Sequence, residues 1–436
     1  MSHRSADPIR DLSVEALARV EGEGAMRVRL RGEEVEDIAL SIYEPPRFFE
    51  GMLVGRRMEE PPDITARICG ICPVAYQMSA CRAIEDACGV AIDPPLRELR
   101  RLMYCGEWIE SHALHIYLLH APDFLGYHSA LELSRDHKEL VQQALALRRA
   151  GTDLVTAIGG RATHPVNVRL GGFHRLPDRD ALAALRPQLE RARDQAAETV
   201  RLVAGFTMPD LAIDHAFVSL AEPGRYPIDA GRLVSSTGLD VPVQEFEEHL
   251  IEEQVARSTA FHARLAGHDG AILVGPLARY ALARDELSPT ARELADEVGL
   301  PPVVTNPYQS IVVRAIEVVE ACVEALAILE AYEQPDRAHV PVPPRTGIGY
   351  GATEAPRGIL LHRYEIDDDG LITAARIVPP TAQNQRAVED DLYDFVAAHA
   401  HLDDEGLRWQ LEQAIRNYDP CISCATHFLD LTVERR

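Results

Sequence analysis

Two cysteine pairs in distant parts of the chain carry its most evident chemistry. Cys69 and Cys72 form one Cys-x-x-Cys turn, and Cys421 and Cys424 form another. Each turn can direct two thiolates at one point, so two such turns can build a four-sulfur metal site. Zinc ribbons place their second pair roughly 15–20 residues after the first, whereas here most of the chain lies between the pairs. We therefore expect a metal at the centre of the fold rather than in a small zinc module.

The flanks of the first pair indicate that it is buried. Ile68, Ile71, Pro73 and Val74 surround it. Burying thiolates without a partner is costly, so we expect a bound soft metal. Nickel, iron and zinc are all compatible with thiolate ligands. Two unrelated structural turns, or a zinc staple, are the alternatives.

Composition limits the class of protein. The chain has 436 residues, of which 46% are hydrophobic, and a formal net charge of −24 with a pI near 5.1. The length and the hydrophobic fraction are enough for a large core in two or three lobes. An acidic surface repels nucleic acid and anionic lipid, so we exclude both as general partners. No segment approaches the roughly 18–20 apolar residues of a membrane span, and residues 1–17 lack the apolar stretch of a secretion signal.

The other four cysteines suit a reducing cytoplasm better than a disulfide framework, because they are scattered along the chain. We expect them to be small core residues. They are Cys81, Cys88, Cys105 and Cys322.

Hydrophobic periodicity predicts a mainly α fold, of the α+β class, with a long-helix bundle as core and small β-hairpin additions. A glycine-rich loop is expected over 151–176. Hairpins are expected over 25–44 and 357–378. Helices are expected over 74–88, 96–120, 132–149, 180–206, 243–267, 308–333 and 386–416.

These elements suggest a division of the chain into consecutive sections. They are an N-terminal β-hairpin section (1–66), a helical bundle core (67–340), a β-hairpin insertion (341–380), C-terminal helices with the second cysteine pair (381–427) and a tail (428–436).

Two other patterns have simpler interpretations. Gly347, Gly349 and Gly351 resemble a dinucleotide-binding loop, but that fingerprint needs a following helix, and here a hairpin follows. The acidic run 367–370 lacks the ligand spacing of a calcium loop and is typical of a turn.

Several motifs, taken in order, resemble the large subunit of nickel–iron hydrogenases. The resemblance extends from residue 19 to residue 427. It rests on Arg19-Val-Glu-Gly22, Arg67-Ile-Cys-Gly-Ile-Cys72, the helix with His112 and His115, Ala355-Pro-Arg-Gly358, and Asp419-Pro-Cys-Ile-Ser-Cys-Ala-Thr-His427.

The resemblance implies different roles for the four cysteines. Cys69 and Cys421 would be terminal nickel ligands. Cys72 and Cys424 would bridge nickel to an iron that carries cyanide and carbon monoxide. Such a centre cleaves dihydrogen heterolytically and reversibly.

The resemblance also assigns residues around the metal. Glu21 would relay protons, although a lone glutamate is more often a surface residue. Arg357 would lie above the open metal position and Pro356 would line the same pocket. Asp419 could pair with Arg357, although an Asp-Pro pair is also an ordinary turn. His112 would lie close to the centre.

An outer metal site is implied as well. Glu50 and His427 match two ligands of a small site that usually holds magnesium. The carboxylate suits magnesium, and the histidine makes iron an alternative.

Two features depart from the family pattern. Tyr76 stands where members often have a histidine that donates to a bridging thiolate, so its hydroxyl would have to make that bond. Residues 428–436 extend beyond His427, after which a maturation endopeptidase usually trims the chain.

The subclass follows from smaller motifs. The chain length, the Ile-Ser-Cys-Ala-Thr-His ending, Thr163-His-Pro165 and Gly171-Gly172 resemble the cytoplasmic hydrogenases coupled to NAD(P). Electrons would leave through a small subunit with iron–sulfur clusters and then a flavin-containing diaphorase, since no such site is expected on this chain. The alternatives are a structural zinc protein and a non-catalytic quinone-module subunit of the respiratory complex I type, which would lack the four cysteines.

Overall fold

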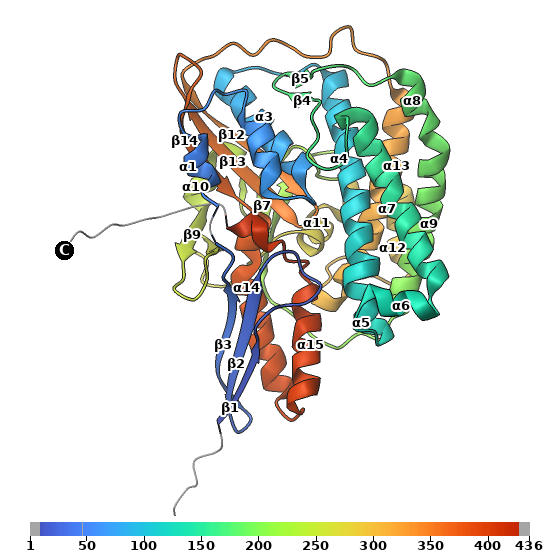
Figure 1. Cartoon of the computed structure of the whole chain (residues 1–436), viewed down its shortest axis with the longest axis vertical. Coiled ribbons are helices and arrows are strands. Elements are labelled where there is room, and N and C mark those ends of the chain that lie inside the picture. The colour runs from blue at the N-terminus through green and yellow to red at the C-terminus, as the bar shows by residue number, and fades with distance from the viewer. Residues whose placement is uncertain (1–8, 46, 427–436) are drawn as a thin grey trace, which may run out of the picture.

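The computed structural model describes residues 9–45 and 47–426 (Figure 1). Four long helices form a bundle on one side of the molecule: α4 packs against α7 and α13, and α13 packs against α9. Helix α13 is buried over most of its length, as expected of a helix that is apolar on nearly all sides. The bundle helices are α4 (Pro94–Leu114), α7 (Lys138–Gly159), α9 (Arg186–Ala204) and α13 (Ser310–Ala331).

Helix α3 (Pro73–Cys88) connects the bundle to an antiparallel sheet of β12 (Gly347–Ala355), β13 (Gly358–Ile366) and β14 (Ile372–Val378). Gly347, Gly349 and Gly351 lie in β12. A Cβ atom on Gly349 would be 2.0 Å from the Ala83 carbonyl oxygen of α3. Their small size therefore lets the strand approach the helix backbone closely.

A second antiparallel sheet has the order β1-β2-β3, with β1 (Ile9–Val14), β2 (Gly24–Arg31) and β3 (Glu34–Ile42). The hairpin predicted over 25–44 is confirmed, and β1 is an addition that periodicity did not indicate. Helix α14 (Pro380–His399) packs on β3, and α15 (Asp404–Arg416) lies beside it in Figure 1.

The helix predicted over 243–267 is wrong. The segment forms a short helix, α10 (Phe246–His249), and then an antiparallel hairpin of β9 (Leu250–Gln254) and β10 (Phe261–Leu265). Strand β10 packs against α14, so tertiary contacts outweigh the helix preference of the glutamates and alanines in this segment. A further sheet has the order β11-β6-β7-β8, from β6 (Ala216–Ala221), β7 (Arg232–Ser235), β8 (Asp240–Val241) and β11 (Ile272–Leu273).

Other observed boundaries also differ from the predicted ones. Helix α7 continues to Gly159, so the predicted loop over 151–176 begins later, and the predicted helix over 386–416 is two helices. The run predicted over 96–120 ends in a π-helical turn, His115–His120, and continues into α5. The remaining elements are α1 (Phe49–Leu53), α2 (Pro61–Thr65), α5 (Ala121–Leu125), α6 (Ala130–Asp136), α8 (Arg179–Ala184), α11 (Pro276–Ala283), α12 (Pro289–Glu297), β4 (Val168–Arg169) and β5 (Gly172–Phe173).

Within the described residues, no helix is both long and apolar enough to cross a membrane. Cys81, Cys88, Cys105 and Cys322 are free and buried, which confirms them as core residues. The division into five sections stays a prediction, and its tail lies outside the described residues.

Candidate metal centre

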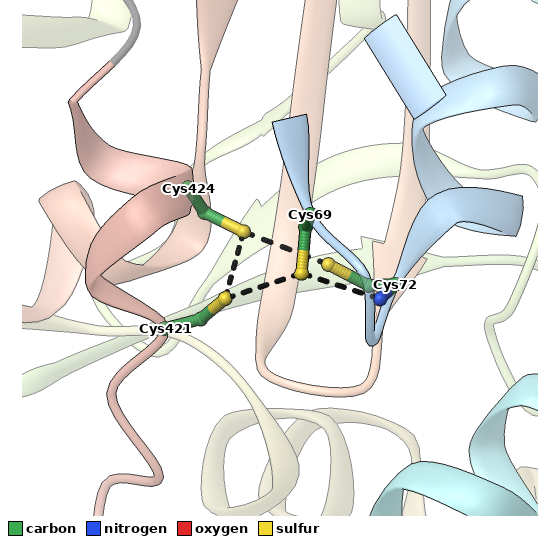
Figure 2. A group of neighbouring side chains, drawn as sticks. All are labelled: Cys69, Cys72, Cys421 and Cys424. Atoms are coloured by element: carbon green, nitrogen blue, oxygen red, sulfur yellow. Dashed lines mark hydrogen bonds between the residues drawn. The ribbon is translucent and has the colours of Figure 1, made fainter. Parts of the chain in front are cut away.

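The four cysteines of the two pairs converge on one point (Figure 2). Their sulfur atoms all lie within 4.8 Å of one another, and all four side chains are buried. The Sγ atoms of Cys69 and Cys421 are 3.3 Å apart, and those of Cys72 and Cys424 are 3.6 Å apart. Each pair from one part of the chain thus faces its counterpart from the other.

The first pair lies at the start of α3. A short 3-10 turn ends at Ile68, and Pro73 begins the helix, where a residue without an amide hydrogen is readily accommodated. The Glu107 carboxylate of α4 accepts hydrogen bonds from the amides of Val74 and Ala75, at 2.7 and 3.1 Å. The turn that carries both thiols is therefore fastened to the bundle.

The second pair is held by the N-terminal section and by α14. Cys421 forms an isolated parallel β-bridge with Glu21, and its amide donates to Thr381 Oγ1 at 3.0 Å. Asp419 has a φ of 50°, a left-handed conformation that is uncommon for a residue other than glycine. Strain of this kind often marks functional segments.

The thiols strongly influence one another's ionisation. Contacts with the Cys421 and Cys424 thiols hold the pKa of Cys69 well below its usual value, whereas the neighbouring thiols and burial raise the pKa of Cys421 well above it. Four thiolates at these distances repel each other unless a cation offsets their charge. Four buried, convergent sulfur donors therefore fit a soft metal ion such as nickel or iron.

Glu21 lies next to the cluster. Its Oε2 accepts from the Cys421 thiol at 3.1 Å and from the Ser423 amide at 3.0 Å. The Ser423 hydroxyl in turn donates to Glu44 at 2.9 Å. Glu21 and Glu44 are both only partly buried, so the carboxylates beside the second cysteine pair lie near the surface.

Arg357 and Asp419 form a buried ion pair beside the thiols. Arg357 Nε donates to the Asp419 carbonyl at 2.8 Å, and its Nη2 donates to the carboxylate at 3.0 Å. Arg314 approaches the other carboxylate oxygen at 3.7 Å. The Asp419 carboxylate and the nearby thiols raise the pKa of Arg357 despite its burial. Pro356 is buried next to it in the turn between β12 and β13.

The predicted outer site is only partly described. Glu50 lies in α1, and its Oε1 accepts from the Ile377 amide at 2.6 Å. Burial raises the pKa of Glu50 to about 7. The Arg47 amide donates to the Thr426 carbonyl at 2.7 Å, which brings the C-terminal segment next to α1. His427 lies outside the described residues.

His112 contacts the bundle around the cluster. Its Nε2 is 3.0 Å from Glu317 Oε2, and its ring packs on Trp108. Burial lowers the pKa of His112 to about 4. His115 Nε2 is 2.8 Å from the Arg416 carbonyl oxygen. These contacts make His112 part of a polar network within the helices.

Tyr76 is fully buried near the thiols. Burial, followed by the proximity of Cys424 and Cys72, raises the pKa of its hydroxyl well above the usual value. The hydroxyl is therefore a neutral group close to Cys424.

Some residues at the centre were not predicted. Arg47 contacts both cysteine segments, because its Nη2 donates to the carbonyls of Ile68 and Ser423. Glu44, Glu107 and Thr381 also contact the two turns or their neighbours. No local pattern marks these residues. Glu44 and Arg47 lie between β3 and α1, Glu107 lies in α4 and Thr381 lies in α14.

The chain is similar to known proteins over nearly its whole length. The family model described as nickel-dependent hydrogenase matches residues 47–147 and 268–427. Sulfhydrogenase 1 subunit alpha of Pyrococcus furiosus is 32% identical to the chain, covering 96% of the chain and 98% of that protein.

Two other similar proteins have NAD in their descriptions. The NAD-reducing hydrogenase HoxS subunit beta of Cupriavidus necator is 28% identical, covering 96% of this chain and 95% of that protein. A crystal structure of an NAD+-reducing NiFe hydrogenase in the H2-reduced state superimposes with a TM-score of 0.87 at 27% identity, covering 96% of this chain and 99% of the other.

Proposed function

The chain belongs to the nickel-dependent hydrogenase family as a catalytic large subunit, and from this premise we propose how its residues divide the reaction. Cys69 and Cys421 would hold nickel alone, and Cys72 and Cys424 would hold nickel together with an iron that carries cyanide and carbon monoxide. The centre, when bound, supplies the heterolytic and reversible cleavage of dihydrogen. The observation that carries this assignment is the convergence of four buried sulfur atoms.

Glu21 takes the proton at the Cys421 sulfur. Its Oε2 is within hydrogen-bond distance of that atom, and the Ser423 amide holds the same oxygen in place. A carboxylate at this distance can act as a general base without moving. Glu21 is itself only partly buried, so the proton can pass from its carboxylate to solvent.

Arg357 provides a fixed positive charge at the centre. Asp419 binds it through both its carbonyl and its carboxylate, so the guanidinium cannot rotate freely. A preorganised charge of this kind stabilises developing negative charge without reorganisation. Pro356 and His112 shape the surroundings of the same site.

Glu50 and His427 bind a small outer cation, magnesium or iron. The support is the half-buried Glu50 carboxylate, which accepts from the Ile377 amide and whose pKa is raised because burial disfavours its charge. A cation would offset this charge and would tie the C-terminal segment to α1.

Electrons leave through partner subunits. The relatives' names describe alpha and beta subunits, and one describes reduction of NAD. We infer a small subunit with iron–sulfur clusters, a flavin diaphorase and NAD(P) as acceptor, which places the complex in the cytoplasm. A maturation endopeptidase removes residues 428–436.

Metal analysis of the purified complex tests this function. Nickel and iron near one each per large subunit are expected, with infrared bands from cyanide and carbon monoxide and dihydrogen-dependent reduction of NAD+ or NADP+. Zinc alone, with neither infrared bands nor dihydrogen oxidation, would contradict the proposal. A mature, nickel-loaded chain that still carries residues 428–436 would contradict the maturation step alone.

A further inference from the structure

Arg279 is a buried arginine whose guanidinium is fully occupied. It lies in α11 and is 0% exposed. Nε and Nη2 donate to the two carboxylate oxygens of Glu317 at 2.7 and 2.8 Å, and Nη1 donates to Glu354 at 2.9 Å. Its guanidinium carbon lies 4.4 Å from the centre of the Trp108 ring. These contacts leave it little freedom to move.

The same guanidinium also binds the backbone just before Arg357. Nη1 donates to the Ala355 carbonyl and Nη2 to the Pro356 carbonyl, each at 2.9 Å. Ala355 pairs with Gly358 across the β12–β13 hairpin, so Pro356 and Arg357 form its two-residue turn. Arg279 therefore holds the short turn from which Arg357 extends to the metal centre.

The first residue before α11 supports the turn from a second side. A Cβ atom on Gly275 would lie 2.6 Å from the Arg357 carbonyl oxygen, so only glycine allows this approach. The Arg279 amide donates to the Gly275 carbonyl at 2.9 Å, so both contacts come from one helical turn. The turn and the start of α11 thus form one packed unit.

Arg357 has few other means of keeping its position. Its side chain reaches Asp419 as described, and its Nη1 lies 3.4 Å from the Ser111 hydroxyl, which is a long contact. Asp419 in turn sits only two residues before Cys421. A shift of the turn would therefore change the distance between the guanidinium and the thiols.

We propose that Arg279 is a positioning residue that fixes the Pro356–Arg357 turn and so places the Arg357 guanidinium at the metal centre. The inference rests on the proposed function of that centre. Lysine cannot replace this arginine, because an ammonium has three donors and lacks the planar fork that joins two carboxylates to two carbonyls. The proposal also explains why an arginine and two glutamates are buried together beside the bundle.

The test is Arg279→Lys in the complete complex, with Arg101→Lys as the matched control. Arg101 is 1% exposed and binds Asp229, Glu324 and the Tyr226 carbonyl, none of which belongs to the 355–358 turn. Both variants should lower thermal stability and keep nickel. Only Arg279→Lys should reduce kcat, by roughly 10- to 100-fold, with KM for dihydrogen within about twofold of wild type.

Two further readouts separate positioning from general loss of structure. Hydrogen–deuterium exchange should increase in the peptide spanning 347–366 for Arg279→Lys and not for Arg101→Lys. In an Arg357→Lys background, Arg279→Lys should lower kcat by less than about twofold, because both changes act through one guanidinium. Unchanged kcat in Arg279→Lys, an equal loss in Arg101→Lys, or independent effects of the two changes would overturn the inference.

A milder pair of variants serves if Arg279→Lys does not assemble. Glu317→Gln weakens the ion pair with Arg279 and leaves the residues of the turn unchanged. Glu324→Gln weakens the corresponding ion pair of Arg101. A fall in kcat of about threefold or more in the first and not the second supports the proposal, and equal kcat values contradict it. A wild-type complex without nickel or dihydrogen oxidation would instead contradict the proposed function.

Discussion

Glu21 and Cys421 are joined twice, once through their side chains and once through their backbones. The carboxylate lies 3.1 Å from the thiol, and the Glu21 carbonyl accepts from the Ile422 amide at 2.9 Å within an isolated β-bridge. The backbone contact fixes the position of Glu21 along the segment that carries the second cysteine pair. The side-chain contact is therefore a consequence of how the N-terminal section docks.

Replacing Glu21 with glutamine should separate proton transfer from metal binding. Glutamine keeps the shape and can still accept from the Ser423 amide, but it cannot take a proton. We expect dihydrogen oxidation to fall by about 10²- to 10⁴-fold while nickel content stays at the wild-type value. Glu23→Gln, at an exposed neighbour, should leave the rate unchanged. A wild-type rate in Glu21→Gln would exclude Glu21 as the proton acceptor.

Replacing Cys421 with serine should remove nickel. A hydroxyl is a poor ligand for a soft metal, and only three thiolates would remain. We expect loss of both nickel and dihydrogen oxidation, measured by elemental analysis and turnover of the purified complex. Cys322→Ser is the control, because Cys322 is buried in the core away from the four converging thiols. Full activity in Cys421→Ser would rule out its role as a ligand.

The buried His112 should make stability depend on pH. Burial lowers its pKa from 6.5 to about 4, so the folded state favours the neutral ring. This contribution is fully present above pH 6.5. Below it, the unfolded chain binds a proton that the folded chain does not, and the contribution is lost as the pH falls to about 4. The difference in unfolding free energy between wild type and His112→Gln should change by up to about 3 kcal/mol across this window.

Chemical denaturation at several pH values measures this difference. If it stays constant between pH 6.5 and 4, His112 is not held neutral by burial.

Replacing Gly349 with alanine should destabilise the fold. The new methyl group would lie 2.0 Å from the Ala83 carbonyl oxygen and 2.2 Å from the Ala87 amide nitrogen, so β12 would have to move away from α3. We expect a loss of about 3 kcal/mol or more. Gly51→Ala in α1 meets no atom within 4 Å and should be neutral or stabilising by up to about 1 kcal/mol. Equal urea midpoints for the two variants would show that β12 can shift without cost.

The convergence of the four cysteines could be predicted from the sequence because they occur in two short, distinctive motifs. The two Cys-x-x-Cys turns, Glu21 and the Arg357 turn each have local patterns, and the structure brings them together. Long helices such as α13 were predictable as well, because their apolar residues repeat over many turns.

The remaining features depend on contacts between distant segments. The β9–β10 hairpin contains helix-forming residues, and it is favoured by the packing of β10 on α14 rather than by its own pattern. Arg279 and Glu317 lie within ordinary helical sequences, where a charged residue normally indicates an exposed face. Only the folded arrangement shows that each compensates the charge of the other.

The separation of the two cysteine pairs has a thermodynamic consequence. Cys69 and Cys421 are 352 positions apart, so a metal bound to both closes almost the whole chain into a loop. By the loop-entropy relation for cross-links, a closure of this size disfavours the unfolded state by about 5–6 kcal/mol. A bound ion would then act as a cross-link as well as a reaction centre. Its release and the global unfolding of the chain should coincide on heating.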